Sequence, residues 1–397
     1  MDRKPVSSPR VLHIIASVDP ATGGPIEGLL RIDEALGDGA EREIVTLDLP
    51  DAQYLKDFPI TVHALGLRLG DWAKALPGRR FSFSPHLTPW LSANLHRFDT
   101  VVVEGLWNYA SVGASLVLPG QRTPYFVFPH GMLDPWFRRR YPLKHLAKQV
   151  FWWLFEGRLL AGARRVLFTT DQEQRLALGQ FHGHRYRSEV VGYGTRAPPP
   201  PTPLQISAFR ALVPTLAARP YLLFLSRLHE KKGVDVLVEA FARIAPDHPG
   251  LDLVVAGPGE SGLVQSIRAL VTERGLDARV HLPGMVRGDA KWGAMYGCEA
   301  FVLVSHQENF GIVVAEALAC GRPVLISDQV NICDEVAKGG AGIVDHDTVE
   351  GAERMIRSFL AQSDADTRAM ATAARTVFRD HFDVQTTARR LADVLAG

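Results

Sequence analysis

The stretch Ser305-His-Gln-Glu-Asn-Phe-Gly-Ile-Val-Val-Ala-Glu-Ala-Leu-Ala-Cys320 decides the fold of this chain. The run before it, Ala300 to Val304, is apolar and predicts a buried strand, and the residues from Gly311 onward predict a helix. This helix is apolar on every side, and Glu316 is its only charged residue. A helix that is apolar all round is buried, and a buried carboxylate is unfavourable unless a partner satisfies it. The stretch therefore predicts a strand, a polar loop and a buried helix whose carboxylate needs a partner.

A second carboxylate, Glu308, lies in the loop just ahead of the predicted helix. The backbone N–H groups of the first helical turn, here Asn309 to Ile312, would point at any anion bound there. Two interpretations follow. Either Glu308 and Glu316 frame an anion-binding site, or Glu308 only balances the helix dipole and Glu316 is a satisfied core carboxylate.

The length and composition of the chain indicate an ordinary globular protein of two domains. A chain of 397 residues is long for a single hydrophobic core, and 46% of its residues are hydrophobic, which excludes a disordered or collagen-like protein. The net charge of +1 conceals an asymmetry, because residues 1–200 carry 24 Lys and Arg against 19 Asp and Glu, whereas the remainder carries 20 against 24. The two halves are therefore expected to bind different partners.

The sequence carries no sign of a metal site, a disulfide framework or a membrane span. Its three cysteines, Cys298, Cys320 and Cys333, lack metal-ligand spacing and are odd in number. Residues 1–10 are polar, and no stretch approaches the roughly 20 consecutive apolar residues that a membrane-spanning helix needs. We therefore expect a cytoplasmic protein with reduced cysteines.

The first half of the chain alternates strand-like and helix-like segments, which predicts a parallel α/β sheet. After a first strand comes a loop with Gly23 and Gly24, where the backbone can approach a ligand closely or simply turn. His130 follows another strand, in the kind of loop where open α/β sheets bind ligands, although a single loop histidine is often structural. The expected strands span residues 11–16, 43–47, 100–103, 125–128 and 165–168, and the expected helices span 26–36, 87–95 and 143–160.

Residues 135–165 combine basic and aromatic side chains with a single acidic residue, Glu156. This composition suits an anionic membrane surface, where aromatic side chains anchor and cations meet lipid head groups. It equally suits a helix with aromatic residues in the core and a solvated basic face. Nucleic acid is not expected, because no helix-turn-helix, zinc or RNA-binding signature accompanies the segment. The basic residues are Arg138, Arg139, Arg140, Lys144, Lys148, Arg158, Arg164 and Arg165, and the aromatic residues include Trp136, Phe137, Phe151, Trp152 and Trp153.

A proline-rich linker, Pro198 to Pro203, cannot form a helix or a central strand and predicts a domain boundary near residue 196. A second α/β series follows, and its first strand leads into a loop that carries Arg227 and Lys232. Two cations at the carboxyl end of a strand favour an anion site, although each alone would be an ordinary solvated charge. The expected strands of this half span residues 221–225, 251–256, 280–282, 300–304 and 323–326.

Two further patterns imitate nucleotide-binding motifs. Residues 257–262, Gly-Pro-Gly-Glu-Ser-Gly, match the dinucleotide fingerprint with Asp277 about twenty residues later, but they follow the second strand of their domain and not the first. The Asp-x-Asp strings at 345–347 and 364–366 fall where aspartate commonly caps a helix. We interpret the aspartates as structural and give the fingerprint little weight.

Motifs in a fixed order give the chain a family resemblance. They are Gly23-Gly24-Pro25, Pro129-His130-Gly131, Ser226-Arg227-Leu228, Lys232-Gly233-Val234-Asp235, Gly257-Pro258-Gly259, Leu282-Pro283-Gly284-Met285-Val286, and Glu308-Asn309-Phe310-Gly311 with Glu316-Ala317. With these motifs the chain resembles the retaining glycosyltransferases of the large group 1 family, also called family 4. The resemblance implies the GT-B fold, in which two facing Rossmann-like α/β domains enclose an interdomain cleft and a C-terminal helix crosses back to the N-terminal domain.

The resemblance also implies domain limits and roles. Residues 1–196 would form the acceptor-side domain, residues 197–381 the nucleotide-sugar domain and residues 382–397 the returning helix. The implied catalytic residues are His130, which would hydrogen-bond the donor sugar near its anomeric centre, Glu308 on the transferred sugar, and Arg227 and Lys232 on the diphosphate. Of the implied donor-binding residues, Gly23 and Gly24 would approach the diphosphate, and Glu316 would bind the ribose hydroxyls. Gly284, Met285 and Val286 would line the base pocket, and Gly257 would also contact the donor. The backbone amides of Asn309, Phe310 and Gly311 would contact the sugar and the phosphate.

The implied activity is transfer of a hexose from a UDP- or GDP-linked donor to a glycan or lipid-linked glycan, in surface or exopolysaccharide biosynthesis. Such enzymes retain anomeric configuration and need neither a metal ion nor a cofactor. We expect a cytoplasmic enzyme that works at the inner face of the cell membrane if residues 135–165 bind anionic lipid. Two alternatives stay open, namely a nucleotide-sugar 2-epimerase of the same fold and a non-catalytic nucleotide-sugar-binding protein. Met285 and Val286 replace the more usual histidine of this turn, which leaves the base undetermined.

Overall fold

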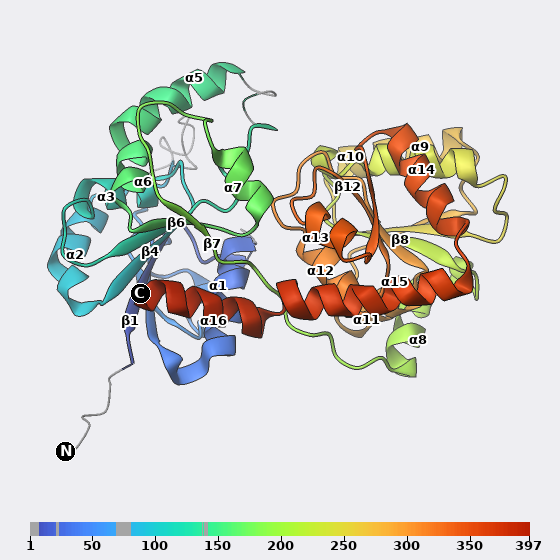
Figure 1. The fold of residues 1–397 in the computed structure, drawn as a ribbon, viewed down its shortest axis with the longest axis horizontal. Helices are drawn as coiled ribbons and strands as arrows, with labels where there is room; N and C mark the ends of the chain where they lie inside the picture. Colours follow the sequence, from blue (N-terminus) through green and yellow to red (C-terminus); the bar gives the residue numbers. More distant parts are fainter. Residues whose placement is uncertain (1–7, 21–23, 69–80, 137, 139–141) are drawn as a thin grey trace. The chain divides into compact units, whose positions relative to one another are not determined.

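The structure consists of two units, each with one parallel sheet flanked by helices (Figure 1). The computed structural model describes residues 8–20, 24–68, 81–136, 138 and 142–397. The first unit comprises residues 1–193 together with 387–397, and the second comprises residues 194–386. The predicted α/β class with two Rossmann-like domains is therefore confirmed.

The sheet of the first unit has seven strands in the order β3-β2-β1-β4-β5-β6-β7, and every neighbouring pair is parallel. The central strands are rich in β-branched and aromatic residues and are buried, which is typical of a sheet covered on both faces. The strands are β1 (Arg10–Ile15), β2 (Glu41–Thr46), β3 (Thr61–Ala64), β4 (Thr100–Glu104), β5 (Tyr125–Phe128), β6 (Arg165–Phe168) and β7 (Ser188–Val190).

Helices cover both faces of this sheet because alternate strand residues point to opposite sides. Leu12 and Ile14 of β1 share one core with the helices on one face, and Phe126 and Phe128 of β5 share another with Leu391 of the last helix. The predicted return of the C-terminal helix to the first unit is thus confirmed. The helices are α1 (Gly24–Leu36), α2 (Leu87–Asn94), α3 (Tyr109–Val117), α5 (Pro142–Phe151), a π-helical turn (Trp152–Glu156), α6 (Gly157–Gly162), α7 (Asp171–Ala177) and α16 (Val384–Ala396).

The second unit has a six-stranded sheet in the order β10-β9-β8-β11-β12-β13, again parallel throughout. Its strands are β8 (Tyr221–Leu225), β9 (Asp252–Ala256), β10 (Val280–Gly284), β11 (Ala300–Leu303), β12 (Val324–Ser327) and β13 (Gly342–Asp345). Its helices are α8 (Pro203–Leu212), α9 (Val234–Ile244), α10 (Ser261–Glu273), α11 (Gly288–Gly297), α12 (Ile312–Ala319), α13 (Cys333–Lys338), α14 (Val349–Leu360) and α15 (Asp364–Val377), with a π-helical turn (Phe378–Phe382) after the last.

The sequence prediction misses three strands, β3, β7 and β13. Each lies at the edge of its sheet, has three or four residues and is at most half-buried. Such strands lack the continuous apolar run that marks a buried strand, because one side of each faces away from the sheet. The central strands, which carry the candidate site, were predicted correctly.

Gly233 joins the loop after β8 to α9 and cannot carry a side chain. Its φ is +59°, and a Cβ there would overlap the carbonyl oxygen of Val304. We expect Gly233→Ala to lower the free energy of unfolding by about 3 kcal/mol or more, through left-handed strain and the overlap together. Gly275→Ala is the matched control, since Gly275 has a φ of +67° in open space and should cost only about 1 kcal/mol. Urea unfolding of both variants checks this, and equal midpoints would contradict it.

Glu156, in the π-helical turn, is a buried carboxyl group in the first unit. It is fully buried, and its Oε1 accepts hydrogen bonds from the backbone N–H of Trp107 (2.9 Å) and the Ser111 hydroxyl (2.8 Å). Burial raises the pKa of Glu156 to about 7, although these hydrogen bonds and the charge of Lys148 lower it in part. The group therefore titrates near neutral pH.

This raised pKa predicts a pH-dependent stability. Between the unfolded-state pKa of about 4.3 and about 7, folded Glu156 keeps a proton that the unfolded chain has released, so stability falls as pH rises through this window. Relative to Glu156→Gln, the wild-type protein should lose about 3 kcal/mol of unfolding free energy between about pH 4.5 and about pH 7.5. Urea unfolding at several pH values measures the difference, and parallel pH profiles would refute the prediction.

Candidate functional site

The second unit has a topological switch point between β8 and β11. These strands are neighbours in the sheet, yet the chain leaves them toward opposite edges, and ligands of open α/β sheets bind at such a point. The loop after β8 carries Arg227 and Lys232, and the loop after β11 carries Glu308. The His306 N–H donates to the Lys231 carbonyl (2.7 Å) and ties the two loops together. The structure thus gathers three of the predicted site residues at one edge of one sheet.

Lys232 and Glu308 form an ion pair between these loops, and their side chains are only 16% and 19% exposed. The main chain of Glu308 is fixed as well, because its N–H donates to Gln329 and its carbonyl accepts from Asn331. Arg227 is exposed beside them. Burial, with the charges of Arg227 and Lys231 nearby, lowers the pKa of Lys232 to about 8. Cations outnumber carboxylates here, which favours a bound anion.

The helix that follows Glu308 begins where the sequence predicts. Gly311 adopts a left-handed conformation with a φ of +77° and precedes the first residue of α12, Ile312. The Val314 N–H donates to the Gly311 carbonyl and closes the first turn. Phe310 is buried edge-on against Phe382. This packing fixes the loop, so the helix N-terminus, with its partial positive charge, lies beside Glu308 and Lys232.

Glu316 is buried on α12, with 4% of its surface exposed. Its Oε1 accepts from the Lys291 ammonium of α11 (2.6 Å). Its Oε2 is buried and, among the residues that the structure describes, has no hydrogen-bond partner. An unsatisfied carboxylate oxygen is costly, so Oε2 is suited to receive the hydroxyl groups of a ligand. The sequence predicts that Glu316 needs a partner but does not identify Lys291.

The glycines of this edge make room for close backbone contacts. Gly257 follows β9 with a φ of +141°, and a Cβ there would overlap the Ser226 carbonyl. Gly284 ends β10 with a φ of +76° and open space around it. After it come Met285, which is exposed, and Val286, which is buried. The predicted base-pocket residues Gly284, Met285 and Val286 therefore lie at the carboxyl end of β10, and the predicted donor-binding residue Gly257 lies at the carboxyl end of β9.

Acidic residues of the two patterns that imitate nucleotide-binding motifs are bonded to other side chains of the protein. Asp277, the acidic residue of the dinucleotide fingerprint, accepts a hydrogen bond from Thr272 on the surface. Asp345 pairs with Arg354, and Asp347 with His306. Within the described part of the chain, no group of three or more His, Cys, Asp or Glu side chains is placed to hold a metal ion.

In the first unit, the predicted residues Gly24 and His130 follow β1 and β5, the two strands on either side of β4. Gly24 is the first residue of α1, is exposed, and accepts a hydrogen bond from the Tyr193 hydroxyl through its carbonyl (2.8 Å). Gly23 lies outside the described residues. His130 follows β5 in a left-handed conformation with a φ of +50°, which is strained for a non-glycine residue and is common at functional sites. The ring of His130 stacks on Phe128, with 4.4 Å between ring centroids.

A buried carboxylate that the prediction misses, Glu104, holds His130 in place. Glu104 Oε2 lies 2.6 Å from His130 Nε2, and its Oε1 lies 2.9 Å from Nδ1 of His13. Burial alone would raise the pKa of Glu104, but the two histidines lower it to about 2, so it is ionised at neutral pH. The sequence could have indicated this residue, because Glu104 ends the apolar strand Thr-Val-Val-Val-Glu and a buried carboxylate there requires a hydrogen-bonding partner.

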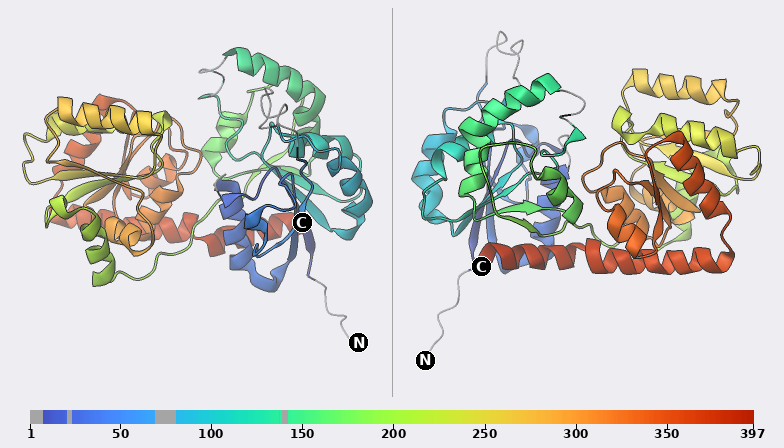
Figure 2. Two further views of the ribbon diagram at one scale, coloured as in Figure 1. Left: turned by 180° about the vertical axis from the view of Figure 1, so that it is seen from behind. Right: turned by 45° about the horizontal axis from the view of Figure 1, so that its top comes forward.

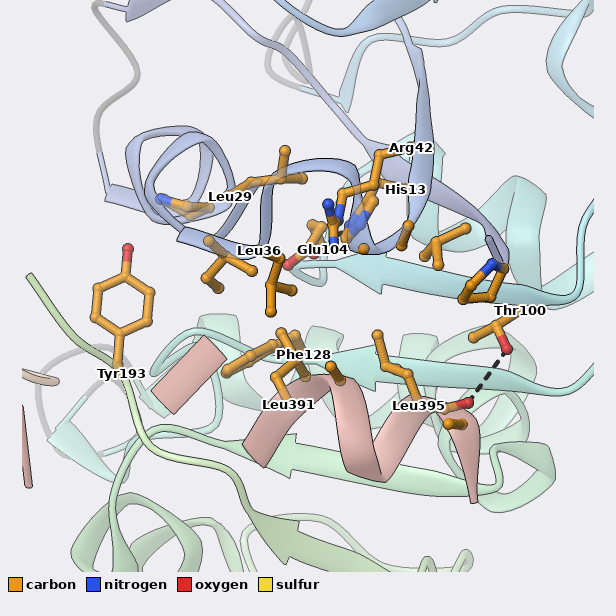
Figure 3. Close-up of a pocket in the computed structure, with 18 of the residues that line it drawn as sticks. His13, Leu29, Leu36, Arg42, Thr100, Glu104, Phe128, Tyr193, Leu391 and Leu395 are labelled. Atoms are coloured by element: carbon orange, nitrogen blue, oxygen red, sulfur yellow. Dashed lines mark hydrogen bonds and ion pairs between the residues drawn. The ribbon is translucent and has the colours of Figure 1, made fainter. Parts of the chain in front are cut away.

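These three side chains line a cavity of about 230 Å³ in the first unit. Figure 3 shows His13 and Glu104 beside α1, with Leu391 and Leu395 of the last helix across the cavity. Nε2 of His13 is buried and has no partner within the described segments. Apolar side chains from α1 and α16 form a large part of the wall, and Arg42 lines the cavity together with the His–Glu–His row.

Both halves of the chain match known protein families. Residues 213–377 match the family described as glycosyl transferases group 1, and residues 23–194 match the glycosyl transferase 4-like domain. A D-inositol 3-phosphate glycosyltransferase of Xylanimonas cellulosilytica is 31% identical over 252 residues, which cover 61% of this chain and 58% of the relative. A glycogen synthase of Mycobacterium tuberculosis is 33% identical over 177 residues, 44% of this chain and 41% of the relative. The chain thus spans about half the length of the curated relatives it matches.

Solved structures of low sequence identity share the whole fold. HepE of Anabaena, in complex with UDP and glucose, superposes with a TM-score of 0.75 at 20% identity over 98% of this chain and 99% of its own. The sucrose-phosphate synthase of Thermosynechococcus elongatus gives a TM-score of 0.76 at 19% identity over 97% and 98%. WaaG, a glycosyltransferase involved in lipopolysaccharide biosynthesis, gives 0.67 at 18% identity. These structures show that the chain has the GT-B fold. The two family models, which together match most of the chain, identify it as a group 1 glycosyltransferase.

Proposed function

We propose that this protein transfers a hexose from a nucleoside diphosphate sugar to a glycan or lipid-linked glycan acceptor, in surface or exopolysaccharide biosynthesis. The observation that carries the proposal is the buried Oε2 of Glu316, which has no hydrogen-bond partner among the described residues. Glu316 belongs to the helix that follows the loop after β11, and Arg227 and Lys232 belong to the loop after the neighbouring strand β8. A nucleotide sugar offers both a pair of ribose hydroxyls and a diphosphate. This combination matches a carboxylate acceptor beside two cations.

Each residue of the second unit then has a role in holding the donor. Glu316 accepts the ribose hydroxyls, Arg227 and Lys232 bind the diphosphate, and Glu308 orients the transferred sugar. Because Lys232 pairs with Glu308 in this structure, the incoming diphosphate and sugar would each take one partner of that ion pair. The backbone amides of Asn309, Phe310 and Gly311 contact sugar and phosphate, Gly284, Met285 and Val286 line the base pocket, and Gly257 also binds the donor.

The first unit contributes to the same donor in this proposal. Gly23 and Gly24 are assigned to the diphosphate, and His130 hydrogen-bonds the transferred sugar near its anomeric carbon. Glu104 and His13 do not touch the donor but fix the ring of His130. A strained histidine held by a buried carboxylate is already in position before the substrate binds, which lowers the cost of ordering it during the reaction.

The reaction breaks the bond between the anomeric carbon and the diphosphate and forms a bond to an acceptor hydroxyl oxygen. The leaving diphosphate gains negative charge, which Arg227, Lys232 and the N-terminus of α12 stabilise as it develops. We propose that the acceptor attacks from the face that the diphosphate leaves, so that configuration is retained and the departing phosphate takes the acceptor's proton. No metal ion has a role in this scheme.

The donor is proposed to carry uridine or guanosine. The complex of HepE with UDP-glucose supports uridine by analogy of fold. A thermal-shift screen with UDP-, GDP- and ADP-linked hexoses tests this choice. One nucleotide class should raise the melting temperature in a saturable way, and no shift with any of them would contradict the proposed function. Incubation with the donor alone separates a transferase from a 2-epimerase, which would change the sugar without an acceptor.

Replacing Glu104 should impair turnover more than donor binding. In Glu104→Gln the charge-assisted hydrogen bonds to His13 and His130 are lost, so His130 is no longer held in one orientation. We expect kcat to fall about 10- to 100-fold, roughly 1.4–2.7 kcal/mol, with a smaller change in donor KM. Steady-state kinetics measures both parameters.

Glu43 offers a matched control for this variant. It is a partly buried carboxylate on β2 that also bonds a histidine, His63 (2.6 Å), but it does not line the cavity. Glu43→Gln should lower stability and leave kcat close to wild type. Equal kcat in Glu104→Gln and Glu43→Gln would show that Glu104 is only structural.

A lipid-linked acceptor would require the enzyme to work at the inner face of the cell membrane. No helix in the described residues is long and apolar enough to cross a bilayer. Contact with lipid would therefore be made from the surface of the protein, in keeping with a peripheral membrane enzyme.

A further inference from the structure

The outer helix of the first unit carries a stripe of exposed apolar side chains. Five of the twelve large apolar side chains that are exposed among the described residues fall within residues 143–154. They lie three or four residues apart along α5 and its π-helical turn, and so share one helical face. α5 lies at the outer margin of its unit in every view (Figures 1 and 2). The stripe consists of Leu143, Leu146, Val150, Trp153 and Leu154, which are between 49% and 80% exposed.

The opposite face of the same segment is fixed to the protein. Trp152 is only 2% exposed and belongs to the core, and the Lys148 ammonium lies 4.5 Å from the ring centroid of Trp107. The indole N–H of Trp153 donates to the His182 carbonyl (2.9 Å), which orients a ring that stays half exposed. The sequence left open whether the aromatic residues of this segment are membrane anchors or core residues. Trp152 packs into the core, whereas Trp153 stays half exposed.

Among the described residues between positions 135 and 165, every exposed charged side chain is a cation. The only acidic residue between positions 135 and 165 is Glu156, which is fully buried. The exposed cations next to the stripe along the helix are Lys144 and Arg158, whereas Arg164 lines a separate hollow with Glu189 and Asp393. An apolar stripe flanked by cations, without an exposed carboxylate, complements a surface that is apolar inside and anionic outside.

We propose that this α5 surface, the five apolar residues with Lys144 and Arg158, docks the protein onto an anionic phospholipid bilayer. This proposal depends on the proposed function in one respect, because docking would serve to bring the enzyme to a lipid-linked acceptor. α5 is too short to span a bilayer and lies along its surface, with the stripe among the upper acyl chains and the cations at the head groups. Trp153, with an apolar body and a polar edge, suits that boundary.

A second copy of the chain is a poorer occupant of the α5 surface. A two-fold contact would place each patch against itself and bring the like charges of Lys144 and Arg158 together. No carboxylate of the segment would balance them. An anionic bilayer satisfies both the apolar and the charged parts of the surface.

Vesicle flotation with the full-length protein tests the proposal. The wild-type protein should float with vesicles of phosphatidylcholine and phosphatidylglycerol at low salt, and weakly with phosphatidylcholine alone. Leu143→Gln/Leu146→Gln should lower the partition coefficient about tenfold or more. Lys144→Gln/Arg158→Gln should weaken binding at low salt and have little effect at high salt, because salt already screens those charges.

The control double variant is Leu204→Gln/Leu212→Gln, which changes two exposed leucines of α8 in the second unit and should float like wild type. The proposal is overturned if wild type stays unbound at low salt, or if both leucine pairs behave alike. It is also overturned if the protein self-associates through Leu143 and Leu146 without binding vesicles. Donor binding measured on the same samples keeps the two proposals apart: vesicle binding without donor binding contradicts only the proposed function, and the reverse contradicts only the docking.

Discussion

Lys232→Ala is expected to lower kcat/KM about 100- to 1000-fold, or roughly 3–4 kcal/mol. In the proposed mechanism Lys232 contacts the diphosphate throughout the reaction, and its effect is largest when the departing group gains charge. The side chain is only 16% exposed, so its charge acts in a site of low dielectric and is poorly replaced by water. The loss should therefore appear in kcat as well as in KM.

Lys231 provides the neighbouring control. Its ammonium donates to Gln307 (3.1 Å), and it shares the loop and charge of Lys232 without pairing with Glu308 in this structure. Lys231→Ala should change kcat/KM by no more than about threefold, as expected for a partly exposed charge. Thermal unfolding shows whether Lys232→Ala is folded, because the change also leaves Glu308 without its partner. A folded Lys232→Ala with wild-type kinetics would contradict the assignment of the diphosphate site.

Glu316→Gln is expected to weaken donor binding about 10- to 100-fold, or roughly 1.4–2.7 kcal/mol. Hydroxyl groups donate more strongly to a buried carboxylate than to a neutral amide. The substitution also leaves Lys291, whose side chain is 24% exposed, without its counter-charge. Calorimetric titration with the preferred nucleotide measures the change in affinity.

A donor that lacks the ribose 2′-hydroxyl separates the direct contact from a structural effect. The wild-type protein should lose affinity for the 2′-deoxy nucleotide, because Glu316 then has one donor fewer. Glu316→Gln should discriminate much less between the two nucleotides. If wild type and variant lose the same affinity when the hydroxyl is removed, Glu316 does not bind the ribose.

The stretch from Ser305 to Cys320 was predictable because its physical demands are local. β11 ends at Leu303 and α12 starts at Ile312, next to the left-handed Gly311, as the apolar runs and the glycine indicate. The burial of Glu316 follows from the apolar residues of its own helix, so it can be predicted without knowing what packs against that helix. Because β8 and β11 are neighbours in the sheet, the loops that follow them lie at the same edge, and Lys232 of one loop lies beside Glu308 of the other.

The partners of the buried charges could not be predicted, because they depend on tertiary packing. Lys291 is one of 44 Lys and Arg residues and reaches Glu316 from another helix, 25 positions earlier in the chain. His13, Glu104 and His130 come from β1, the end of β4 and the loop after β5, and only the sheet brings them together. The segment from 135 to 165 was ambiguous for the same reason, since composition cannot tell which side of a helix faces the core.

The central claim is that the second unit binds a nucleoside diphosphate sugar around Glu316, and calorimetric titration with UDP, GDP and ADP tests it most directly. The account predicts saturable binding of one of these nucleotides by the wild-type protein, and much weaker binding by both Lys232→Ala and Glu316→Gln. Wild-type protein that binds none of the three, or variants that bind the nucleotide as tightly as wild type does, would contradict it.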